Sequence, residues 1–244
     1  MMVMVELLGP PRVSSWISAK HWKEWNFLKK HIVCLGDSNT HGYCADPADC
    51  ADGGTRFNEN ERWTQLLQKA LGEEYLVLEE GLGGRTTVFP DPLHEGMSAL
   101  DVVYPILMSH EPVDLLVIML GTNDTKDRLG MNAACIALGM NRLIDKCKSI
   151  PCWGDHAPNI LVICPPHIGD GMVTAPGGAA MGTTGPAKSR ELASRMEPIA
   201  RAQGCAWLDA EGIAEFNKVD FMHLTRKGHA DLAAKLAQIV PTLV

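Results

Sequence analysis

The sequence predicts a three-layer α/β fold, in which a five-stranded parallel sheet of flavodoxin-like order 2-1-3-4-5 carries helices on both faces. Apolar runs alternate with amphipathic segments five times along the chain, a pattern typical of parallel sheets. Several runs are nearly continuous in Val, Ile and Leu, as expected for strands buried on both faces. No internal repeat or second domain is visible. We therefore expect one domain over residues 31–244, preceded by an N-terminal extension at residues 1–30.

The individual elements follow from the same patterns. The apolar runs place five strands at residues 31–35, 75–78, 114–120, 159–164 and 205–208. The amphipathic segments place helices at residues 62–71, 96–110, 132–149, 188–203 and 225–240. Gly72 ends the first helix, and Thr225 is a good N-cap for the last. We expect Pro198 to kink or split the fourth helix, because proline lacks the backbone donor of a helix interior.

Two long loops, residues 44–60 and 165–186, follow strand ends and are expected to border the same edge of the sheet. The second loop is rich in Gly, Pro, Ala and Thr, a composition suited to a mobile flap. The N-terminal extension has two interpretations: a segment packed on the domain, or an arm that docks on a neighbouring subunit.

The composition is that of a globular protein with a sizeable core, since 46% of the 244 residues are hydrophobic and 21% are charged. The net charge of −7 argues against nucleic acid or an anionic membrane as a partner. The longest apolar run, residues 115–120, is too short to cross a bilayer. The eight cysteines form no C-x-x-C pair and no signal peptide is found, which predicts reduced thiols of a cytoplasmic protein. Cys44 and Cys50 share one polar loop and are the pair to examine for a bridge.

A serine follows the first predicted strand, in the turn Gly36-Asp37-Ser38-Asn39. In open α/β sheets ligands bind at the carboxyl ends of the strands, so Ser38 is a candidate nucleophile. Gly-Asp-Ser is also ordinary turn chemistry. The serine interpretation therefore depends on partners elsewhere in the chain.

A possible base and its partner lie just before the last predicted helix, in Asp220-Phe221-Met222-His223. A carboxylate three residues from a histidine can accept its Nδ1–H across a tight turn, which fixes the tautomer and stabilises the imidazolium. Asp-x-x-His is a weak signal by itself. The alternative is a surface turn that caps the helix.

Two further loops supply possible donors for an oxyanion. Gly121-Thr122-Asn123-Asp124 follows the third strand, and the Asn123 amide can donate to a tetrahedral intermediate. The glycine-rich residues 81–85 follow the second strand and allow close backbone approach, so that Gly84 N–H is a second donor. Their alternatives are plain strand-to-helix turns or, for residues 81–85, a phosphate-binding loop. Because these blocks follow strands one, two, three and five, we expect them to meet at one edge of the sheet.

Together these blocks resemble the SGNH hydrolase (GDSL-type esterase) superfamily, over residues from about 32 to the C-terminus. Residues 79–87, 118–126 and 136–140 are similar to its arylesterase/acyltransferase branch. The resemblance implies that Ser38 is the nucleophile, His223 the general base and Asp220 its orienter. It also implies an oxyanion hole formed by Ser38 N–H, Gly84 N–H and the Asn123 side chain.

The substrate pocket is expected to include Asn39, His41, Tyr43 and Thr122. Asn39 stands where many relatives carry leucine, and the loop before the fourth helix is glycine-rich rather than aromatic. We expect Arg85 to anchor the glycine loop. The aspartates of residues 46–52 lack the ligand pattern of an EF-hand, and the histidines lack a zinc spacing, so neither a metal nor a cofactor is expected.

These observations predict a serine carboxylester hydrolase that forms an acyl-enzyme with short-chain, acetyl-type esters such as aryl or sugar acetates. Water is the expected acyl acceptor, and the resemblance adds transfer to an alcohol. It also implies a homo-oligomer. The alternative is a non-catalytic flavodoxin-like module that binds a phosphate or nucleotide on residues 81–85.

Overall fold

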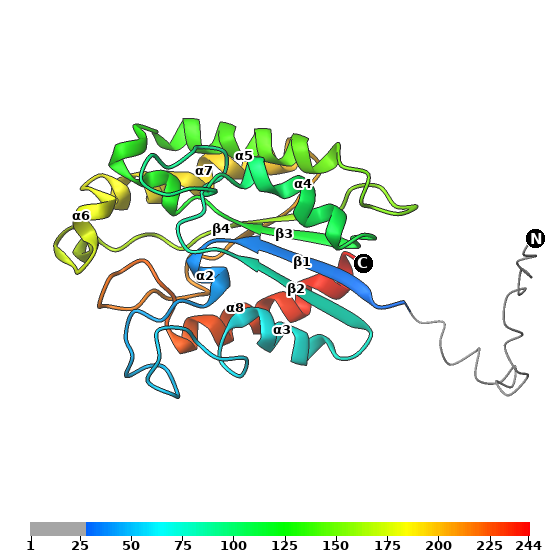
Figure 1. Ribbon diagram of the computed structural model, residues 1–244, viewed down its shortest axis with the longest axis horizontal. Coiled ribbons are helices and arrows are strands. Elements are labelled where there is room, and N and C mark those ends of the chain that lie inside the picture. The colour runs from blue at the N-terminus through cyan, green and yellow to red at the C-terminus, as the bar shows by residue number, and fades with distance from the viewer. Residues whose placement is uncertain (1–27) are drawn as a thin grey trace, which may run out of the picture.

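The computed structural model describes residues 28–244, which form a five-stranded parallel sheet between two layers of helices (Figure 1). The sheet order is β2-β1-β3-β4-β5 and neighbouring strands are parallel. The predicted fold class and strand order are therefore confirmed. The strands are β1 Lys30–Gly36, β2 Tyr75–Gly81, β3 Leu115–Met119, β4 Ile160–Cys164 and β5 Ala206–Asp209.

The central strands are buried on both faces because each residue contributes to one of two cores. In β3, Leu116 and Ile118 pack in one core and Leu115, Val117 and Met119 in the other. This alternation follows from the period of two of a strand. It explains why these strands are continuous apolar runs rather than alternating ones.

The helices divide between the two faces of the sheet (Figure 1). One core is shared with α4 Ala99–Ser109, α5 Ala133–Lys148 and α7 Gly185–Ala202. The other is shared with α3 Trp63–Leu71 and α8 Arg226–Ile239. Thr225 caps α8 by accepting a hydrogen bond from Gly228 N–H, as predicted. The short helices α2 Ser38–His41 and α6 Gly178–Met181 lie at the edge where the strands end (Figure 1).

Two local expectations need correction. Helix α7 is not split at Pro198; the proline is exposed, so the carbonyl it leaves unpaired can face water. A kink at Pro198 stays a prediction. Helix α4 begins at Ala99 rather than at residue 96, because the residues before it form a loop. The cysteines need no such correction: all eight are free, and Cys44 and Cys50, the pair to examine, are not bridged.

The predicted N-terminal extension lies almost entirely outside the described residues, so it remains a proposal. Within residues 28–244, no helix combines the length and apolar character needed to cross a membrane.

Candidate active site

Ser38 lies directly after β1, as the first residue of α2. Asp37 caps this helix by accepting a hydrogen bond from Asn39 N–H (2.9 Å). Helix α2 packs closely on the end of β2, because a Cβ at Gly81 would lie 2.2 Å from the His41 backbone nitrogen. Only a glycine allows this approach. The serine is thereby held at the edge of the sheet with 8% of its surface exposed.

His223 and Asp220 lie beside this serine although they are far away in the sequence. His223 Nε2 is 2.8 Å from Ser38 Oγ, and His223 Nδ1 is 2.6 Å from Asp220 Oδ2. In the tautomer with its proton on Nδ1, His223 donates to Asp220 and accepts from the serine hydroxyl. This arrangement allows the histidine to take the hydroxyl proton while the carboxylate stabilises the resulting imidazolium.

The loop that carries Asp220 is fixed by its own hydrogen bonds. Asn217 donates to Asp220 Oδ1 (2.9 Å) and accepts from the Asp220 N–H (2.9 Å). The backbone amides of Met222 and His223 also donate to Asp220 Oδ1. Burial opposes ionisation of Asp220, but the hydrogen bonds from His223, Met222 and Asn217 outweigh it and hold the pKa below its ordinary value. Asp220 is therefore an anion when it faces His223.

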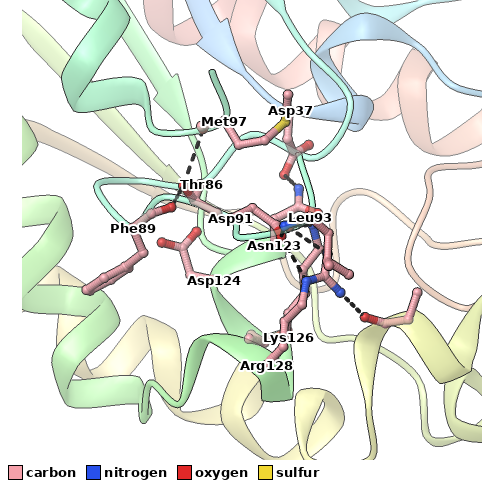
Figure 2. Close-up of polar contacts among 12 residues, drawn as sticks. Asp37, Thr86, Phe89, Asp91, Leu93, Met97, Asn123, Asp124, Lys126 and Arg128 are labelled. Atoms are coloured by element: carbon pink, nitrogen blue, oxygen red, sulfur yellow. Dashed lines mark hydrogen bonds and ion pairs between the residues drawn. The ribbon is translucent and has the colours of Figure 1, made fainter. Parts of the chain in front are cut away.

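Three donors surround the space next to Ser38 Oγ. In the described part of the chain, the backbone amides of Ser38 and Gly84 have no acceptor. Gly84 has φ +90°, which other residues rarely adopt. Asn123 donates one amide hydrogen to Asp37 Oδ2 (3.3 Å), and Figure 2 shows the two side chains facing each other. Its second amide hydrogen has no acceptor among residues 28–244, so the structure brings together the three donors expected from the sequence.

A cavity of about 310 Å³ adjoins Ser38, His223, Gly84 and Asn123. Of the residues predicted to bind substrate, Tyr43 and Thr122 line it. The ring centroids of Tyr43 and His223 lie 4.6 Å apart. A larger cavity of about 510 Å³, between residues 166–169 and 211–218, contains none of these groups.

The structure does not place Asn39 or His41 in the cavity beside Ser38. Asn39 instead joins α2 to the Asp220 loop, donating to Met222 O (3.1 Å) and accepting from Leu224 N–H (2.9 Å). The backbone carbonyl of His41 accepts from Arg56. Both residues support the site rather than line it.

Six further residues line the cavity, and the sequence did not assign them to it. Gly83 belongs to the glycine loop and Met222 to the Asp220 loop. The other four come from the glycine-rich loop before α7: Pro176, Gly177, Ala180 and Met181. The only sequence signal for the last four was the flap-like composition of that loop. We call residues 165–184 the flap from here on.

Buried charges support the two donor loops. Arg85 donates to the carbonyls of Gly36 (3.1 Å) and Glu80, so it anchors the glycine loop as expected. Asp124 accepts hydrogen bonds from the Thr87 N–H (2.9 Å) and hydroxyl (2.5 Å). Burial raises the pKa of Asp124 to about 6, and burial also raises that of Asp37. The two donor loops are thus tied together behind the cavity.

The geometry also bears on phosphate binding and on metals. The glycine loop does not open a helix, since the next helix begins only at Ala99, and a phosphate-binding loop needs a helix N-terminus. Within residues 28–244, His, Cys, Asp and Glu side chains form no group that could hold a metal ion.

Comparisons with known proteins point in one direction. The profile of the GDSL-like lipase/acylhydrolase family matches residues 34–230. The structure is similar to the M. smegmatis aryl esterase (33% identity, TM-score 0.78), covering 88% of this chain and 100% of that chain. It is also similar to a carbohydrate acetylesterase from Sinorhizobium meliloti (30% identity, TM-score 0.77), with coverage of 88% and 100%. Among curated proteins no significant match was found.

Proposed function

Because the chain belongs to the GDSL-like lipase/acylhydrolase family, within the SGNH hydrolase superfamily, we propose that it is a serine carboxylester hydrolase that works through an acyl-enzyme on Ser38. The family and its esterase structures support an esterase that acts on a small-molecule ester with water. The observation that carries the finer proposal is the chain of contacts from Ser38 Oγ through His223 to Asp220, at 2.8 and 2.6 Å.

In the proposed mechanism Ser38 Oγ attacks the ester carbonyl carbon while its proton passes to His223 Nε2. The carbonyl oxygen becomes an oxyanion, which accepts hydrogen bonds from Ser38 N–H, Gly84 N–H and the free Asn123 N–H. The intermediate collapses to the acyl-enzyme as His223 gives its proton to the leaving alcohol. Water then attacks the acyl-enzyme with His223 as base, which releases the acid and restores the Ser38 hydroxyl.

We propose short acyl groups, acetyl above all, and aryl or sugar esters as substrates. The cavity beside Ser38 is small, about 310 Å³, and Tyr43 and the flap bound it. One similar structure is named an aryl esterase and another a carbohydrate acetylesterase. Transfer of the acyl group to an alcohol is a further proposal, which rests on the resemblance to the acyltransferase branch and requires a cavity dry enough to disfavour water.

We further propose that the protein is cytoplasmic and forms a homo-oligomer. We also propose that residues 1–30 are an N-terminal extension of the domain. The free state of all eight cysteines is consistent with a reducing compartment. Sedimentation velocity of the full chain measures the oligomeric state, and a single monomeric species would contradict the homo-oligomer.

The test is the rate of hydrolysis of p-nitrophenyl esters from acetyl to octanoyl, with and without an added alcohol. We expect the acetyl ester to react fastest, an alcohol to divert part of the acyl group, and Ser38→Ala to remove the activity. A folded protein inactive on every ester, which binds a phosphate compound instead, would favour the phosphate-binding module. Activity that survives in Ser38→Ala would refute the assigned nucleophile.

A further inference from the structure

The flap forms one wall of the cavity beside Ser38, through Pro176, Gly177, Ala180 and Met181. These residues surround α6, a helix of four residues. So short a helix leaves its last carbonyls without partners in the helix itself. Contacts within the flap hold part of this wall, since Met181 packs against Ile168 and Met172. The free carbonyls of α6 are open to further contacts from outside the flap.

Arg128 makes such a contact with all three of its guanidinium nitrogens engaged. Nε donates to Asp91 Oδ1 (2.9 Å) and Nη2 to Asp91 Oδ2 (2.6 Å), a bidentate pair. Nη1 donates to the carbonyl of Ala180, in the last turn of α6. Arg128 thus joins Ala180 of the cavity wall to Asp91. Figure 2 shows Arg128 beside Asp91.

Asp91 is a fixed anchor because its carboxylate is completely buried. It accepts further hydrogen bonds from Lys126 Nζ (3.1 Å) and the Leu93 N–H (3.0 Å). The hydrogen bonds from Arg128 and Lys126 hold the pKa of Asp91 well below its usual range. Lys126 Nζ lies behind the oxyanion loop, 3.9 Å from where a Cβ of Gly84 would be. The anchor is therefore continuous with the loop that carries the Gly84 donor.

The neighbouring residue holds the other end of the same flap segment. Asp127 accepts hydrogen bonds from the Thr183 N–H (2.7 Å) and from the Thr184 hydroxyl. Asp127 and Arg128 both belong to the short 3-10 helix Asp127–Leu129, which follows Asn123 closely in the chain. Residues 180–184 are thus held from one short element on the oxyanion side of the cavity.

We propose that Arg128 is a positioning residue for acyl-chain selectivity: by tying Ala180 to Asp91 it fixes the flap wall at a width that admits only short acyl groups. This inference rests on the proposed esterase function. Arg128 lies outside the lining of the cavity, so it acts through the wall and not on the substrate.

Replacing Arg128 by lysine separates the effect of the positive charge from that of the planar guanidinium group. A lysine ammonium can pair with Asp91, but it is a point charge without the planar fork that reaches both carboxylate oxygens and a third acceptor. Arg128→Lys should therefore keep the buried ion pair and release Ala180. Arg128→Met removes the contacts with both Asp91 and Ala180. It should therefore shift the selectivity toward longer acyl groups further than Arg128→Lys does.

The matched control is Arg190→Lys. Arg190 pairs with Asp170 in the same flap, but both side chains are largely exposed and neither residue lines the cavity beside Ser38. The same chemical change there should leave the selectivity as in the wild type, because an exposed ion pair contributes little.

The experiment measures kcat and KM for p-nitrophenyl acetate and octanoate, together with hydrogen exchange of the peptide that covers residues 176–182. We expect Arg128→Lys to keep kcat on acetate within about threefold and to raise the octanoate-to-acetate ratio of kcat/KM by about tenfold, through a lower KM for octanoate. Hydrogen exchange in residues 176–182 should be faster in Arg128→Lys than in Arg190→Lys.

An unchanged ratio with unchanged exchange in Arg128→Lys would overturn the inference. So would a shift that appears in Arg128→Met alone, because charge and not the link to Ala180 would then set the wall. Failure of the proposed function looks different: the wild type itself would hydrolyse neither ester. The hydrogen-exchange comparison tests the tie of Arg128 to the flap even in that case.

Discussion

Replacement of Asn123 by alanine tests the oxyanion donors most sharply. One amide hydrogen of Asn123 is directed at Asp37 (3.3 Å), and the other has no acceptor in the described part of the chain, where Asn123 lines the cavity together with Ser38. Loss of one preorganised donor of this kind costs about 10²–10³ in kcat, or about 2.7–4 kcal/mol of transition-state stabilisation. We expect KM to change little, because the donors match the oxyanion of the intermediate better than the carbonyl of the bound ester.

Asn123→Ala also leaves the buried Asp37 with one donor fewer, which should cost about 1–3 kcal/mol of stability. The assay therefore pairs steady-state kinetics on p-nitrophenyl acetate with urea denaturation, so that kcat is compared for folded protein only. Asn60→Ala, at an exposed position, is the control and should leave kcat unchanged. A loss of less than about threefold in folded Asn123→Ala would refute the donor role, since it is far below the range for such a donor.

The remaining predictions concern the acid–base pair, the cavity wall and a buried carboxyl. Asp220→Asn keeps the shape but favours the wrong His223 tautomer, so kcat should fall by about 10⁴; a loss under tenfold would contradict the orienting role. Tyr43→Ala removes a ring 4.6 Å from that of His223 and should lower kcat/KM about two- to tenfold, whereas no change would exclude Tyr43 from substrate contact. The pKa of Asp124 is raised from 3.8 to about 6 by burial, so the folded state holds this proton more tightly than the unfolded chain. The resulting stabilisation is present at acid pH and is lost as the pH rises through about 6. Relative to Asp124→Asn, the wild type should lose about 2–3 kcal/mol of unfolding free energy between about pH 4 and pH 7, and identical pH dependence in urea denaturation would contradict this.

The fold was predictable because its signals are local and repeated. Each buried strand is an apolar run, and parallel topology places the ends of all strands at one edge. That rule places Ser38 and His223 at the same edge of the sheet, although they lie 185 positions apart. Helix ends were less predictable: the helix expected from residue 96 begins only at Ala99, because Met97 and Ser98 pair with the backbone of Thr86 instead.

The walls of the cavity could not be predicted from the sequence. Asn39 follows the nucleophile directly and was expected in the pocket, but its amide bonds the backbone of Met222 and Leu224. Nothing local shows which way the short helix α2 turns that side chain. The contacts of Arg128 with Asp91 and Ala180 join residues 37 and 52 positions apart. Such pairs depend on how the loops fold over one another, and the hydrophobic periodicity of the sequence does not predict them.

The central claim is that Ser38 is a nucleophile activated by His223. A fluorophosphonate reacts with such a serine and stays bound, so its site can be mapped by mass spectrometry of the digested protein. We predict one adduct per chain, on Ser38, with none on Ser38→Ala and much slower labelling of His223→Gln. A folded wild type that takes up no label, or carries it on another residue, would contradict the account.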